Sequence, residues 1–164
     1  MKYLYCLLVL LLICFESSGQ NYTRDAGMRT GEGLFVSYRI FFDENTAFEG
    51  FAGFARNGIR VIALREFFTP LATNKSENLK FVYGYGIHAG VAYTNKFKFL
   101  YRTFYQDWRW TPQFGLDGLA GFEYRAPELP LLVSVAAQPY FEYSLNRYFQ
   151  MKALNLVVCF KYRF

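Results

Sequence analysis

His88 is the only histidine in the 164-residue chain, and histidine is the side chain most often used for acid–base chemistry near neutral pH. Ala89 and Gly90 follow it directly, and no serine lies two positions away. A serine from another strand, such as Ser134, would be needed to complete a nucleophile–base pair, and the sequence leaves that possibility open. We expect His88 to be a polar group of the protein interior and predict no catalytic residue.

Asp117 and Glu123 have the side-chain types needed for paired-carboxylate cleavage of a sugar bond. Their separation of six residues on one predicted strand corresponds to roughly 20 Å, too far to flank one bond. Structural ion pairing is therefore the better interpretation. The sequence shows no zinc or calcium ligand spacing, and Gly84-Tyr85-Gly86 lacks the lysine and helix of a phosphate loop. We predict no metal site and no cofactor.

The segment from Asn95 to Pro112 is basic and aromatic, and it has no clear strand pattern. Such a composition can bind single-stranded nucleic acid, but tryptophan and basic side chains also suit a membrane–water interface with its lipid phosphates. We predict an irregular loop that forms an interfacial girdle, with a specific surface-binding loop as the alternative, and we expect no nucleic-acid partner. The girdle residues are Lys96, Lys98, Arg102, Trp108, Arg109 and Trp110.

The first nineteen residues have the layout of a secretory signal peptide: Lys2, an apolar run from Tyr3 to Phe15, and small residues up to Gly19. The apolar run of about 13 residues is shorter than the roughly 20 that a spanning helix needs. We predict a signal peptide over residues 1–19 and one mature domain over residues 20–164. Cys159 is then the one cysteine left, so no intramolecular disulfide is possible and we expect a buried filler.

The mature chain alternates apolar and polar residues with the period of β-strands. Aromatic residues make up 21% of the sequence while the mean hydropathy is only +0.05, which suits alternation better than apolar helices. The number of strands in single-chain outer-membrane barrels is even, which adds a short first strand to seven clear ones. The predicted fold is all-β, an eight-stranded antiparallel up-and-down transmembrane barrel. Its strands are Tyr22–Thr30, Leu34–Phe42, Phe48–Arg56, Ile59–Phe68, Phe81–Thr94, Phe114–Arg125, Leu131–Glu142 and Ala153–Phe164.

The distribution of charge indicates which strand faces point into such a barrel and whether lipid or water surrounds its outer wall. Charges of both signs lie on the less aromatic strand faces, and aromatic stripes facing water would form a very large apolar patch. Lipid is therefore the better surroundings, with a soluble lipocalin-like carrier as the less favoured alternative. We expect Lys161 and Arg163 to pair with carboxylates such as Glu123 or Glu142. The predicted polar network of the lumen comprises Arg39, Glu49, His88, Asp117, Glu123, Arg125, Glu142, Lys161 and Arg163.

The signal peptide, the alternating strands and the ending Phe160, Tyr162 and Phe164 together resemble the small outer-membrane β-barrel proteins of Gram-negative bacteria. This eight-stranded class includes the OmpA transmembrane domain and OmpX-like proteins. The resemblance implies an outer-membrane location, contact with membrane lipid and lipopolysaccharide, and a terminal aromatic signal (Phe160, Tyr162, Phe164) read by the barrel-assembly machinery. It implies little about activity, because the class includes structural, adhesive and enzymatic members.

We therefore expect a monomeric, non-enzymatic integral outer-membrane protein that acts structurally or through its outer loops. Both chain ends are expected on the periplasmic side. A lipid A-modifying outer-membrane enzyme and a narrow pore are the alternatives, because the sequence does not define what the lumen holds.

Overall fold

The computed structural model describes residues 23–164 apart from 56, 72–77, 100–101 and 146–147, and all regular elements in this part of the chain are β-strands. The predicted signal peptide lies outside the described residues. No helix among the described residues is long and apolar enough to cross a membrane. The strands are β1 (Arg24–Thr30), β2 (Gly33–Asp43), β3 (Thr46–Ala55), β4 (Gly58–Pro70), β5 (Leu79–Phe99), β6 (Arg102–Arg125), β7 (Leu131–Ala137), β8 (Tyr140–Ser144), β9 (Tyr148–Lys152) and β10 (Leu156–Arg163).

The strands close into one antiparallel barrel. They pair in the order β5-β4-β3-β2-β1-β10-β7-β6, and pairing of β5 with β6 completes the ring. The first predicted strand is β1, and it bridges β2 and the closing strand β10, with Met28 opposite Val36 on one side and Phe160 on the other. The prediction of an eight-stranded antiparallel barrel is therefore confirmed.

The ten labelled strands make eight because two of them are interrupted. β6 pairs with β7 at Ala120↔Ala137 and with β8 at Asp117↔Tyr140, an unchanged register, so β7 and β8 are one strand broken at Pro139. Proline cannot donate to the ladder, although its carbonyl still accepts from the Gly118 amide at 2.8 Å. β9 continues into β10 with one extra residue relative to β7–β8, which is a bulge around 153–155.

One predicted loop is wrong, because Asn95 to Pro112 is not irregular. β5 runs to Phe99 and β6 starts at Arg102, and the two pair along this length with a single register shift between Thr94 and Lys96. The backbone ladder persists here although the side chains do not alternate. This part of the hairpin extends past the end of β4, where Gly58 pairs with Ala92. Beyond that point neither face is held against a barrel interior, so alternation is not required.

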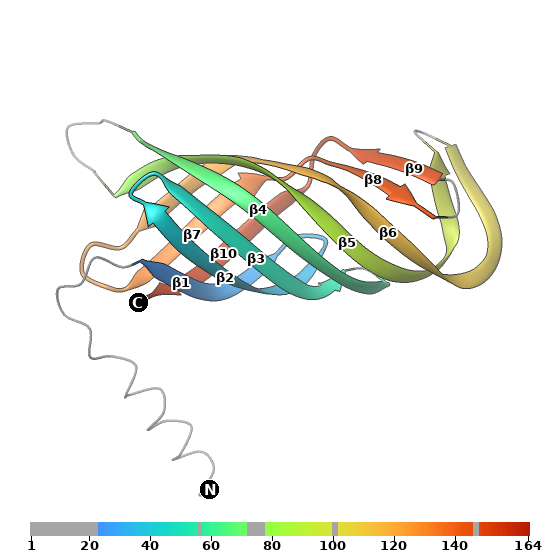
Figure 1. Ribbon diagram of the computed structural model, residues 1–164, viewed down its shortest axis with the longest axis horizontal. Coiled ribbons are helices and arrows are strands. Elements are labelled where there is room, and N and C mark those ends of the chain that lie inside the picture. The colour runs from blue at the N-terminus through green and yellow to red at the C-terminus, as the bar shows by residue number, and fades with distance from the viewer. Residues whose placement is uncertain (1–22, 56, 72–77, 100–101, 146–147) are drawn as a thin grey trace, which may run out of the picture.

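The predicted loop from Leu145 to Gln150 is also shorter than expected, since β9 begins at Tyr148. β5, β6, β8 and β9 extend as a curved sheet past the other strands at one end of the barrel, and β9 contacts β5 there (Figure 1). The C-terminus and the start of β1 lie together at the opposite end. We call these the distal end and the terminal end.

Burial alternates along the strands as the barrel requires. On β2, Phe35, Ser37 and Arg39 are buried while Val36 and Phe42 are exposed. The same outward exposure of large apolar side chains occurs on every strand around the wall. Apolar surface therefore faces out and most charged strand residues face in, which is the reverse of a water-soluble barrel.

Closure between the two chain ends can be checked by a disulfide. Met28 and Phe160 are opposite each other on β1 and β10, and both side chains are exposed on the outer wall. In a background with Cys6, Cys14 and Cys159 replaced by Ser, Met28→Cys with Phe160→Cys should oxidise to a disulfide, measured as a shift in non-reducing gel mobility. Met28→Cys with Leu156→Cys, four residues out of register, is the matched control and should stay reduced. Equal oxidation of both pairs would contradict the register.

Candidate functional site

The structure places the residues of the predicted lumen network inside the barrel. Arg39, Glu49, His88, Asp117, Glu123, Glu142 and Lys161 are all at most 4% exposed. Arg125 and Arg163 are half-buried at the terminal end. A charged group without a partner at such depth would be very costly, so the pairing of each determines whether the interior is stable.

Arg39 is the centre of the terminal half of the interior. Its guanidinium donates to Asp25 at 2.6 and 2.8 Å, to Glu66 at 3.0 Å and to Glu123 at 2.7 Å. These three carboxylates come from β1, β4 and β6, so one side chain on β2 connects four strands of the wall. Planar guanidinium groups suit this role because their donors spread in a fixed fork.

Aromatic rings complete the packing around this guanidinium. Arg39 lies over the rings of Phe41 and Phe68 at 4.8 and 5.0 Å, and Arg125 lies over the same two rings at 5.2 and 5.4 Å. Arg125 also donates to Glu123 at 2.8 Å. These stacked groups cover the terminal side of the ion pairs and keep them out of contact with water.

Lys161 continues the network toward the distal end, but with different partners from those predicted. Lys161 pairs with carboxylates inside the barrel, as expected, but they are Glu49 at 2.7 Å and Asp25 at 3.7 Å rather than Glu123 or Glu142. The reason is register, because β10 lies next to β1, which brings Lys161 opposite Gly27 and beside Asp25. Arg163 donates to the carbonyl oxygens of Ala126 and Leu129, in the turn that joins β6 to β7.

A series of an ion pair and hydrogen bonds links this cluster to the distal half. Arg29 lies 3.7 Å from Glu49 and donates to Gln138 at 2.9 Å, and Gln138 donates to Asp117 at 2.8 Å. Asp117 bonds His88 Nδ1 at 2.6 Å. Ion pairs and polar bonds therefore run without interruption from Arg125 at the terminal end to His88.

His88 sits among acids and an aromatic ring. Its Nε2 is 3.4 Å from Glu142, and its ring meets Tyr140 edge-on at a centroid distance of 5.7 Å. Ser134, the candidate nucleophile, is opposite Glu123 on β6, whereas His88 is opposite Gly115. Eight residues along one strand separate these points by roughly 26 Å, so the structure does not bring Ser134 and His88 together.

Several members of the network were missed from the sequence. Glu66 is buried and inward, while its neighbour Arg65 faces out. The parity of β4, with Ile62, Leu64 and Phe68 on one face, is the signal that would have placed Glu66 inside. The other missed residues are Asp25, Arg29, Arg60 and Gln138.

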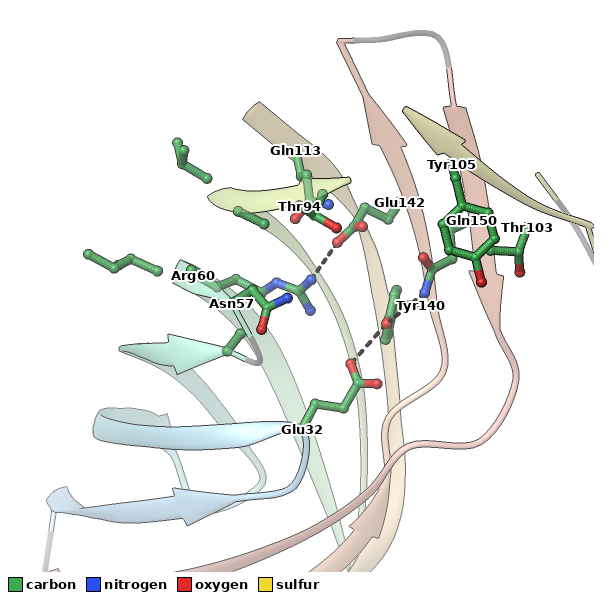
Figure 2. Close-up of a pocket in the computed structure, with 15 residues that line it drawn as sticks. Glu32, Asn57, Arg60, Thr94, Thr103, Tyr105, Gln113, Tyr140, Glu142 and Gln150 are labelled. Carbon is green, nitrogen blue, oxygen red and sulfur yellow. Dashed lines mark hydrogen bonds and ion pairs between the residues drawn. The ribbon is translucent and has the colours of Figure 1, made fainter. Parts of the chain in front are cut away.

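A cavity opens at the distal end above the network. It has a volume of about 410 Å³ and lies between the rim of β3–β4 and the curved extension of β5, β6 and β9. Arg60 bonds Glu142 at 2.5 Å across its base, and Tyr140 donates to Glu32 at 2.8 Å (Figure 2). Lys152 also pairs with Glu32. Glu32 belongs to the β1–β2 turn, so it joins the barrel rim to the β8–β9 hairpin.

The predicted girdle residues lie on the β5–β6 extension. Trp108 and Trp110 are exposed and flank Tyr93, with ring centroids 5.3 Å from it in both cases. Arg102 and Arg109 are also exposed. The side chains of Lys96 and Lys98 lie outside the described residues, although their backbones are in β5.

The predicted assembly residues are on the outer wall at the terminal end. Phe160 and Phe164 are exposed, and the Phe164 ring lies 6.4 Å from Tyr162 and 6.3 Å from Tyr38.

Comparison of the chain with family models, with curated protein sequences and with solved structures finds no match. Among the described residues there is no group of acidic, histidine or cysteine side chains suited to a metal ion.

Replacing Arg39 tests its central role. Arg39→Met leaves Asp25, Glu66 and Glu123 buried without their shared cation, and we expect a loss of about 3–5 kcal/mol in the free energy of unfolding. The measurement is urea unfolding in detergent micelles, followed by tryptophan fluorescence. Arg65→Met on the outer wall is the control and should change stability by less than about 0.5 kcal/mol. Adding Glu66→Gln to Arg39→Met should recover part of the loss, and equal effects of Arg39→Met and Arg65→Met would contradict the assignment.

The contact between Glu32 and the β8–β9 hairpin should depend on pH. Burial raises the pKa of Glu32, but hydrogen bonds from Lys152 and Tyr140 outweigh it and hold the pKa below the ordinary value of 4.5. A depressed carboxyl pKa gives stability that is present above the unfolded value and lost as the pH falls through the folded one. Hydrogen exchange of β9 amides, after correction for the intrinsic pH dependence of exchange, should therefore lose protection below about pH 4.5. Glu32→Gln should abolish the pH dependence, and the same dependence in that variant would exclude Glu32 as its origin.

Proposed function

We propose that this chain is a non-enzymatic integral outer-membrane β-barrel protein that exposes its distal end outside the cell and acts structurally or by surface interaction. The observation that carries the proposal is the inverted wall, with exposed apolar side chains outside and paired charges inside. Water would be a poor solvent for the outer wall, and hydrocarbon would be a good one.

The height of the apolar wall supports membrane insertion. Outward aromatic rings gather near the terminal end, where Phe67 stacks on Tyr83, and near the distal end, where Tyr93 contacts Trp108. Ten residues of β5 separate Tyr83 from Tyr93, which is roughly 33 Å along the strand and roughly 25 Å along the axis at the usual tilt of outer-membrane barrels. That height equals the apolar band between the two aromatic girdles of such barrels. The expected girdle at Trp108 and Trp110 fits the distal one.

The packed interior argues against the alternative of a narrow pore. A water-filled channel would wet the side chains along it, yet Asp25, Glu49 and Glu123 are fully buried and Arg39 is 1% exposed. The ion pairs link strands across the lumen, so they cannot move aside without leaving charges unpaired. A barrel of eight strands is just wide enough for side chains to fill its interior.

The surroundings of His88 argue against the alternative of a lipid-modifying enzyme. Acyl transfer by a Ser–His pair needs a hydroxyl at the free ring nitrogen, and here Glu142 faces Nε2 while Asp117 bonds Nδ1. Its side chain is also fully buried, so the ring is not exposed to a lipid substrate on the outer wall. His88 is better explained as a linker between two acids of the network.

The remaining parts of the proposal follow from the resemblance and the outer wall. Outer-membrane lipid and lipopolysaccharide are the partners in the finished state, and the barrel-assembly machinery is the partner during biogenesis, through Phe160, Tyr162 and Phe164. The start of β1 and the C-terminus lie at one end, as the proposed periplasmic side requires. One closed ring leaves no free strand edge along the apolar wall, which supports a monomer.

Fractionation and bilayer recording test the proposal together. The expressed chain should appear in outer-membrane fractions with a heat-modifiable gel mobility, and the purified protein should give no discrete conductance in planar bilayers. Replacing Arg39, Glu66 and Glu123 together by Ala should open a conducting path, which is the positive control for insertion. A chain found only in the soluble periplasm would overturn the location, and steady channels from the unaltered chain would overturn the closed lumen.

A further inference from the structure

We propose that the distal cavity binds one or two uncharged sugar rings, either as a free saccharide or as the end of a longer glycan. The cavity is not needed to close the barrel, because Gln138, Asp117 and His88 already fill the lumen below it. The inference goes beyond the proposed function and does not depend on membrane location, since it rests on the cavity alone.

The cavity has the dimensions and the fixed shape of a small-ligand site. Its volume of about 410 Å³ lies in the range in which proteins hold small molecules. Tyr140 at its base is held by the hydrogen bond to Glu32, by Arg60 stacked 5.2 Å from its ring, and by the His88 ring on edge. A base that is ordered before binding spares a ligand the cost of ordering it.

The charges of the cavity favour an uncharged ligand. The cation Arg60 is paired with Glu142 at 2.5 Å, and the cation Lys152 is paired with Glu32. An anionic or cationic ligand would have to compete with one of these internal partners and leave the displaced charge unpaired. A neutral ligand can instead use the remaining lone pairs of the carboxylates while both ion pairs stay intact.

The polar groups that remain suit hydroxyls, which both donate and accept. Asn57, Gln113 and Gln150 line different sides of the cavity, and each amide offers donors and an acceptor (Figure 2). The Gln150 amide donates to the Tyr140 hydroxyl at 3.3 Å, a weak bond that a ligand hydroxyl could replace. Amides and carboxylates spread around one space match a molecule with hydroxyls on every side.

An aromatic ring stands at the open side of this polar space. Tyr105 lines the cavity from the β5–β6 extension and is 69% exposed, so its ring is available to a ligand (Figure 2). The C–H face of a sugar is apolar and can pack on an aromatic face, while its hydroxyls point to the amides. Polar walls with one accessible aromatic ring therefore suit a sugar better than a polar solute that has no apolar face.

Saturation-transfer NMR on the intact barrel tests the proposal. The protein should be held in lauryldimethylamine oxide micelles, because alkyl-glycoside detergents would themselves occupy the site. Maltose, cellobiose and lactose are the probes, and at least one should receive saturation from the protein. Glucuronic acid and glucosamine, charged sugars of similar chemistry, should bind at least tenfold more weakly than glucose.

Two single variants place the binding in the cavity. Gln113→Ala and Gln150→Ala should each raise the dissociation constant by about tenfold, as expected for the loss of a hydrogen bond to a ligand. Leu116→Ala is the matched control on β6, because its side chain is exposed on the outer wall, and its affinity should be unchanged. Heat-modifiable gel mobility shows which variants are folded.

A dextran oligosaccharide series separates the two sources of the ligand. Affinity that stays constant with chain length indicates a free saccharide, while affinity that rises beyond the disaccharide indicates the end of a glycan lying along the β5–β6 extension. Absence of saturation transfer to every neutral sugar, stronger binding of the charged sugars, or an equal effect of Leu116→Ala would overturn the proposal.

Discussion

Arg39 and its carboxylates are the interaction on which the rest of the structure depends. A small closed barrel must fill its interior, and this one does so with charged groups packed among apolar side chains such as Phe35, Phe51 and Leu64. Each buried charge therefore needs a partner. One guanidinium meets Asp25, Glu66 and Glu123, which come from strands spread around the ring. Moving any of these strands by one residue would turn its acid to the outer wall. The ion pairs therefore specify the register as well as the packing of the interior.

The need to pair buried charges also makes the two ends of the barrel different. Where Arg39, Lys161 and Asp117 are linked, the lumen is full and its side chains are buried. Past His88 the β1–β4 strands end, while β5, β6, β8 and β9 continue, and the paired interior gives way to the distal cavity. Because the interior below it is closed, the polar space for the proposed ligand lies at the extended end.

The places where the strands of the barrel wall are interrupted are explained by where the extension begins. Pro139 and the bulge around 153–155 lie at the level where the extension leaves the barrel. A bulge increases local twist and bends a strand, which lets β8 and β9 continue in another direction without losing the ladder. Glu32 then ties this hairpin to the β1–β2 turn through Tyr140 and Lys152. The distal cavity thus has one wall from the barrel rim and one from the extension.

Alternation of side chains was enough to predict seven strands and which faces of most strands are polar, because a strand side chain can point only to one of two sides. The eighth strand was predicted from the even strand number of outer-membrane barrels. Where alternation is absent, as from Asn95 to Pro112, the sequence predicted a loop, although main-chain pairing continues there and aromatic side chains contact each other between the strands. Pairing across the lumen could not be read from the sequence either. Lys161 meets Glu49 rather than Glu123 because strand order and stagger place them together, and both are properties of the closed ring. The sequence by itself therefore determined the architecture and the polarity of its two faces, while only the tertiary structure decided which charges pair and where a cavity remains.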